Sequence, residues 1–198
     1  MRSLTFFLLF LIPLHPAAAQ WRLTLRQGTG SVWGHSRDEG SPDHPAFLPD
    51  RPMSFALAIS RDVGRQRVTI DLRRTSADLA LRGPGTTIVT RGVLHASSAA
   101  LEAARRLAGA AGRPTLHGGI GVAVERWQFD LGASDARWRV GGRGALEVGL
   151  PIHGRWDAVL RGELAASASI FTTDELPEGY VRKTGWRRGG AIGVGWRW

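Results

Sequence analysis

The sequence contains no cysteine and only one lysine. Without cysteine the chain has no disulfide scaffold, no thiolate metal site and no cysteine nucleophile. Lys183 is the single lysine among 26 basic residues, so arginine carries nearly all of the positive charge, and 17 acidic residues leave a formal net charge of +9. No apolar run beyond residue 20 approaches the roughly 18 residues of a membrane helix. The 198 residues suit one domain, and they include 26 glycines and eight tryptophans.

The first twenty residues, MRSLTFFLLFLIPLHPAAAQ, have the order of an export signal. Arg2 is followed by an apolar stretch that is too short to span a bilayer, and then by a small-residue cleavage site. We therefore expect a signal peptide at residues 1–19 and a single domain at 20–198; a buried N-terminal helix is the alternative. An exported protein has little opportunity to meet DNA, so we expect no nucleic-acid partner in spite of the basic charge.

Beyond the signal, apolar residues alternate with polar or small ones. Alternation with a period of two is typical of strands, because successive side chains point to opposite faces. Seven segments follow it, at residues 21–26, 53–60, 67–73, 116–125, 138–150, 156–166 and 192–198. The pattern predicts an all-β protein.

The segment 97–107, SSAALEAARRL, leaves two possibilities open. Its alanine and leucine content favours a helix. As a strand it would place Leu101 and Ala103 on one face and Glu102 and Ala104 on the other. We expect a strand, because an eighth one brings both ends of the domain together.

The segments between the expected strands alternate in length. Short ones fall at residues 62–64, 108–113 and 151–154, and long ones at 27–52, 75–96, 128–136 and 167–185. The long segments are rich in turn-forming residues. This order predicts an eight-stranded antiparallel up-and-down β-barrel with four long loops at one end.

Such a barrel can turn its apolar face inward, as in a soluble calycin-like carrier of an apolar ligand, or outward toward lipid. Strands of roughly ten residues and tryptophans near strand ends favour the transmembrane form. The expected lipid-facing set has no central charge, apart from Arg188, which would lie at a rim. The tryptophans concerned are Trp21, Trp127, Trp138, Trp156, Trp186, Trp196 and Trp198, and we expect Trp21, Trp138, Trp156 and Trp186 to be interface anchors.

The last segment, Ile192-Gly193-Val194-Gly195-Trp196-Arg197-Trp198, resembles the C-terminal signal of Gram-negative outer-membrane β-barrels. With the export signal, the chain is similar to the small OmpA-, OmpX- and OmpW-like barrels. The resemblance implies an outer-membrane location, contact with outer-membrane lipid, and recognition by the barrel assembly machinery. It also implies an assembly signal formed by Ile192, Val194, Trp196 and Trp198.

The same alternation sends many charged residues into the lumen. Eight strands enclose a space that side chains just fill, and buried charges there must pair. Arginine suits this role because its planar fork binds carboxylates through two hydrogen bonds. We therefore expect a plugged lumen and a structural or loop-mediated interaction role, with a charge network of Arg67, Asp71, Glu125, Arg139, Arg143, Glu147, Asp157, Arg161 and Glu163, joined by Arg22, Arg26, Arg73, Glu102, Arg106, Arg187 and Arg197.

No motif indicates an active site. His35 and His44 share a loop with acidic residues, but no spacing fixes a metal site, and the acidic loop at 171–180 could bind an unknown partner. His95-Ala96-Ser97 puts a histidine and a serine on one strand face. It is similar to the His–Ser pair of lipid A deacylases, but it lacks an obvious acidic partner. We expect no catalytic residue, no metal and no cofactor, with an outer-membrane lipid-modifying hydrolase as an alternative.

Overall fold

The computed structural model describes residues 20–40, 44–83, 85–110, 112–130 and 136–198. The expected export signal, residues 1–19, lies outside the described residues. In the described part of the chain, no helix has both the length and the apolar character needed to cross a membrane.

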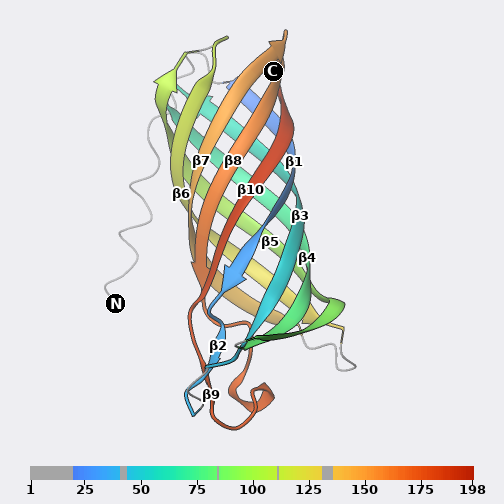
Figure 1. The fold of residues 1–198 in the computed structure, drawn as a ribbon. Helices are drawn as coiled ribbons and strands as arrows, with labels where there is room; N and C mark the ends of the chain where they lie inside the picture. The colour runs from blue at the N-terminus through green and yellow to red at the C-terminus, as the bar shows by residue number, and fades with distance from the viewer. Residues whose placement is uncertain (1–19, 41–43, 84, 111, 131–135) are drawn as a thin grey trace, which may run out of the picture.

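Eight long antiparallel strands close into a barrel, as the sequence predicts (Figure 1). Each strand pairs with its neighbour in the chain, and the first pairs with the last. Around the ring the order is β1-β10-β8-β7-β6-β5-β4-β3. The strands are β1 (Gln20–Trp33), β3 (Ala46–Val63), β4 (Gln66–Gly83), β5 (Thr86–Gly109), β6 (Thr115–Phe129), β7 (Arg137–His153), β8 (Trp156–Ser167) and β10 (Gly185–Arg197).

The two ends of the barrel differ. At one end, here called the terminus end, Trp21 and Trp198 exchange backbone hydrogen bonds of 3.2 and 3.1 Å. Glycines at positive φ make the tight turns there, with Gly64 between β3 and β4 and Gly154 between β7 and β8. The opposite end, here called the mouth, carries β2 (Ser36–Asp38) and β9 (Tyr180–Arg182), which pair with each other, and the 3-10 helix η2 (Thr173–Glu175) (Figure 1).

Residues 97–107 are part of β5, which confirms the strand prediction. Leu101 is 50% exposed on the outer face, whereas the neighbouring Glu102 is 4% exposed inside the barrel. The helical propensity of the segment is overridden because β4 and β6 pair with it on both sides. The ladder shifts register between Arg106 and Ala108, at the turn that leads to β6.

The connections at the mouth are shorter than the sequence suggests. The expected loop at residues 75–96 is wrong: β4 runs to Gly83 and β5 begins at Thr86, so most of this segment extends a β-hairpin (Figure 1). A register shift between Ala77 and Leu79 interrupts the alternation. Arg74 places a charge on the outward parity before this point, so a strict alternation of apolar and polar residues stops at Arg73 and is then broken again by the shift.

Apolar side chains cover the outside of the barrel. Ile120, Val140 and Ile192 are 75, 68 and 66% exposed, and charged residues lie inside. This is the reverse of a calycin-like carrier, so that alternative is wrong. Trp127 also differs from expectation: it shares the inward parity of Glu125, it is buried, and its Nε1 donates to Glu125 Oε2 over 3.0 Å.

Candidate functional site

Glu147 is the centre of an ion-pair network in the lumen. Its Oε1 accepts hydrogen bonds from Arg67 Nη1 over 2.8 Å and from Arg22 Nη1 over 3.2 Å. Its Oε2 lies 3.6 Å from Arg26 Nη1 and 3.7 Å from Arg161 Nη1. One carboxylate on β7 therefore links arginines from β1, β4 and β8 across the barrel.

A second layer of the network lies beside it. Arg161 makes a bidentate contact with Glu102, with N–O distances of 3.1 and 2.5 Å. Arg143 bridges this pair to Asp71, since its guanidinium nitrogens lie 3.3 Å from Glu102 Oε2 and 3.4 Å from Asp71 Oδ1. Asp71 also pairs with Arg26. The planar guanidinium forks thus connect β1, β4, β5, β7 and β8 in the interior.

Further pairs extend the network toward both ends. Near the terminus end, Asp157 contacts Arg22 at 3.3 Å and Arg197 at 3.0 Å. Asp62 receives two hydrogen bonds from Arg67, of 2.6 and 2.9 Å. Toward the mouth, two carboxylate–arginine pairs join the same network, namely Glu163 with Arg73 and Glu125 with Arg187.

The residues expected in the lumen from the sequence mostly meet there, with three differences. Arg106, near the terminus end of β5, donates to the Gly64 carbonyl over 3.0 Å instead of a carboxylate. Arg139 lies nearer the mouth, where its side chain donates to the carbonyls of Ser169 and Ile170 instead of a carboxylate. Asp62 joins the network although the sequence predicts a turn at residues 62–64. The signal in the sequence was its position two residues before the turn glycine Gly64, which places it opposite Arg67 in the hairpin register.

The interior leaves little free space. Two cavities bordered by lumenal residues have volumes of about 30 and 20 Å³, one beside Arg26, Arg73 and Glu163 and the other beside Glu125 and Trp127. Each has room for only one or two water molecules. Charged side chains therefore fill the lumen where a channel would need open space.

An apolar cluster closes the mouth above the charged lumen. The segment between β8 and β9 folds inward and buries Ile170, Phe171 and Leu176. The ring of Phe171 contacts those of Phe47 and Phe129, with centroid separations of 6.3 and 5.9 Å. The cluster is completed by Ala77, Val93, Leu94, Ala96 and Trp127. We call the segment between β8 and β9, residues 168–179, the cap.

His35 holds the cap in place through two hydrogen bonds. Its backbone oxygen accepts a hydrogen bond of 2.7 Å from Ser169 Oγ, and its Nδ1 accepts one of 3.2 Å from the Ile170 N–H. Gly185 is required beside it, because a Cβ there would overlap the His35 ring. Burial lowers the pKa of His35 to about 4, so the ring is neutral and its Nδ1 can accept.

The other candidate sites do not assemble. In the described residues, no three histidine or acidic side chains are placed to hold a metal ion. The Nδ1 of His44 lies 2.8 Å from the Asp38 backbone oxygen. His95 and Ser97 lie on the outer face of β5, and no hydrogen bond between them is recorded in the described part of the chain. His95 Nε2 lies 3.8 Å from Asp130 Oδ2.

The chain is similar to known proteins in its fold but not in its sequence. No family model matches the sequence, and a search of curated proteins finds no relative. Among solved structures, the outer membrane protein OprG from Pseudomonas aeruginosa superposes with a TM-score of 0.61 and 13% identity, covering 91% of this chain and 96% of that one. The chain has the fold of the small outer-membrane β-barrels.

Two further outer-membrane barrels superpose with TM-scores of 0.53 and 0.51. A major outer membrane protein from Thermus thermophilus gives a TM-score of 0.53 at 13% identity, covering 91% of this chain and all of that one. The attachment invasion locus protein Ail of Yersinia pestis, in complex with sucrose octasulfate, gives 0.51 at 13% identity, with 91 and 99% covered. At these identities, the comparison establishes the barrel fold.

Proposed function

We propose that this chain is an integral outer-membrane protein whose barrel is closed by side chains, with a structural or interaction role through the surface at the mouth. The observation that carries the proposal is the continuous apolar outer face of a closed barrel. Soluble monomers rarely expose contiguous apolar patches larger than a few hundred Å². Within a bilayer this face would contact acyl chains, and each of the eight strands pairs with a neighbour on both sides in the closed ring.

Tryptophans at both ends of the apolar face support this location. Trp21, Trp156 and Trp198 are exposed at the terminus end. Trp33, Trp138 and Trp186 are exposed toward the mouth, where Trp33 and Trp186 stack with their centroids 6.5 Å apart. Two such belts are typical of membrane-spanning barrels, because indole rings favour the headgroup region at each interface.

The closed lumen and the cap support a role other than transport. A diffusing solute would have to displace paired arginines and then the apolar cluster at the mouth. The surface of the mouth is formed in part by β2, β9 and the cap. We propose that a partner, which the sequence does not identify, binds there.

We propose no enzymatic activity and no cofactor. An acyl hydrolase would need Ser97, His95 and an acidic residue in one hydrogen-bonded series. His95 contacts the exposed Asp130, but within the described residues no hydrogen bond joins Ser97 to His95. Replacing Ser97 with alanine should therefore leave the acylation pattern of co-expressed lipid A unchanged, and a changed pattern would contradict this assignment.

Cell fractionation tests the proposed location. The full chain should lose residues 1–19, sediment with the outer membrane and resist extraction by carbonate. Its folded band should migrate differently on a gel before and after boiling, as a closed barrel does. Recovery of the mature chain in the periplasmic fraction without detergent would contradict the proposal.

A further inference from the structure

Two arginines on the outer face of the barrel share one row of the sheet. Arg74 on β4 pairs in register with Ser97 on β5, which pairs with Arg126 on β6. All three side chains are exposed on the outer face. Neighbouring strands lie about 4.8 Å apart, so the two arginine backbones are separated by roughly 10 Å with Ser97 between them. Both guanidinium groups can therefore reach one anion held over Ser97.

Within the described residues, neither the Arg74 nor the Arg126 side chain forms an ion pair or a hydrogen bond with another side chain. Two other outward arginines near the tryptophan belts are engaged: Arg188 donates to Ser31 Oγ over 3.0 Å, and Arg61 lies over the ring of Trp21 at 5.5 Å. A cation that faces lipid without a counter-ion is costly, unless an anion from the surroundings meets it.

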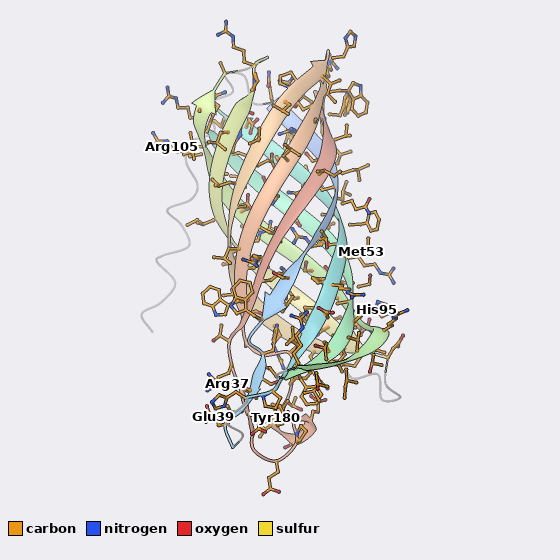
Figure 2. The ribbon with its side chains drawn as sticks, in the orientation of Figure 1. Arg37, Glu39, Met53, His95, Arg105 and Tyr180 are labelled. Carbon is orange, nitrogen blue, oxygen red and sulfur yellow. The ribbon has the colours of Figure 1, made fainter. Side chains whose placement is uncertain are left out.

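The surface around the row is amphiphilic. Toward the terminus end, the next outward row is apolar and consists of Leu72, Ala99 and Val124. Toward the mouth, the next outward row is polar and consists of Ser76, His95 and Gln128 (Figure 2 labels His95 on this side of the barrel). The arginine row thus lies on the boundary between an apolar and a hydrogen-bonding surface.

Aromatic side chains border the row on both sides. Phe55 pairs with Arg74, and Trp138 pairs with Arg126. An open depression of the outer surface includes Phe55, Arg74, Ser97, Arg126 and Trp138 among its lining residues. Trp138 belongs to the belt at the mouth, so the row lies where lipid headgroups of the leaflet at that end would begin.

We propose that Arg74, Ser97 and Arg126 form a binding site for the phosphate of a phosphorylated, multiply acylated glycolipid in the outer leaflet. The guanidinium groups bind the phosphate oxygens, and Ser97 Oγ donates a third hydrogen bond. The acyl chains lie on Leu72, Ala99 and Val124. The polar row toward the mouth, Ser76, His95 and Gln128, supplies donors and acceptors for sugar hydroxyls, which distinguishes this ligand from a simple phospholipid. The inference rests on the proposed membrane location.

Native mass spectrometry of the full mature chain in detergent tests the site, with diphosphorylated lipid A as the probe and phosphatidylglycerol as the competitor. The double variant R74Q/R126Q should bind lipid A at least roughly tenfold more weakly than the wild type, because two charge-assisted contacts are lost. R74K/R126K, which keeps the charge, should retain part of the binding. R105Q is the matched control, since Arg105 is also exposed and outward on β5 but lies near the terminus end (Figure 2); its affinity should equal that of the wild type.

The possible outcomes separate this inference from the membrane location. Equal lipid A affinity of R74Q/R126Q and the wild type would overturn the site, and so would an equal loss in R105Q. Phosphatidylglycerol that competes as well as lipid A would overturn the choice of a glycolipid. Each variant must first show the wild-type shift in gel mobility on boiling, which establishes that its barrel is folded. A wild-type chain that sediments with the outer membrane but ignores lipid A refutes only the site.

Discussion

At the scale of single residues, Glu147 shows what holds the interior together. Two of its four arginine neighbours donate hydrogen bonds to it, so one carboxylate neutralises charge from three strands. A buried ion pair contributes little net stability when it replaces a good apolar contact, but removing one partner leaves the other charge uncompensated. Each charged residue of the network therefore depends on its partners. Removal of the central carboxylate, Glu147, should destabilise the barrel more than removal of any other single member.

Replacing Glu147 with glutamine should lower the free energy of unfolding by about 3 kcal/mol, because Arg22, Arg67 and Arg26 would lose a shared counter-charge. Urea titration of the barrel in lipid vesicles measures the change. Glu178→Gln, on the exposed part of the cap, is the matched control and should be neutral. Equal stabilities of the two variants would contradict the role given to Glu147.

His35 makes the cap sensitive to acid. Burial lowers the pKa of His35 to about 4, with smaller effects from Glu125, Arg187 and Arg139, against about 6.5 when the chain is unfolded. The folded form binds the proton less well, so the contribution of His35 is complete above pH 6.5 and falls as the pH drops toward 4. The loss amounts to at most about 1.4 kcal/mol per pH unit in that window.

Hydrogen exchange at the Ile170 amide, which donates to His35, should therefore become faster between pH 6.5 and 4 than the intrinsic rate explains. The exposed His153, in the turn region at the other end, is an internal reference for an unburied ring. A His35 ring that titrates near pH 6.5 in the NMR spectrum would show that the cap does not bury it.

At the scale of elements, the strands were predictable where alternation is strict and were missed where it breaks. Inward residues such as Glu102 and Arg161 sit at every second position, so parity alone assigned them to the lumen. The outer part of the β4–β5 hairpin, within residues 75–96, was missed because Arg74 puts a charge on the outward parity and a register shift between Ala77 and Leu79 then breaks the alternation. The inward cap could not be predicted, because its burial depends on Phe47 and Phe129 from distant strands.

The sequence also did not predict the pair of outward arginines, Arg74 and Arg126. The predicted strands ended at Arg73 and Glu125, one residue before Arg74 and Arg126. A local sequence pattern does not reveal that these two residues share a row, because the register between β4, β5 and β6 is a property of the assembled sheet.

The last strand gives a prediction about assembly. Trp198 stacks on Trp196 at a centroid separation of 4.9 Å, and its backbone exchanges hydrogen bonds with Trp21 of β1. We expect Trp198→Ala to reduce the amount of folded barrel several-fold in cells, because both the closing contact and the proposed assembly signal lose an aromatic ring. Trp138→Ala, in the middle of the chain, is the control for loss of an interface tryptophan. Normal levels of heat-modifiable Trp198→Ala protein would contradict the expectation.

At the scale of the whole molecule, the arginines behind the net charge of +9 have different environments. Those in the lumen are nearly balanced by carboxylates, and others face outward near the tryptophan belts. The lumenal arginines predict that the purified barrel does not conduct. Planar-bilayer recording should show no large, stable current steps, with an open porin as the positive control. Large steps that persist would mean that the charge network does not fill the lumen in a membrane.

The absence of cysteine permits the most direct test of the central claim that the apolar outer face lies in lipid. Single cysteines placed at the outward positions 120, 122 and 124 of β6, and at the exposed Glu178 of the cap as the control, can be probed in the barrel assembled in cells with a membrane-impermeant maleimide and with a lipid-dissolved quencher of an attached fluorophore. We expect positions 120, 122 and 124 to be quenched from lipid and to resist the maleimide, whereas position 178 is labelled by the maleimide and is not quenched. Labelling of those three positions by the aqueous reagent, without quenching from lipid, would contradict it.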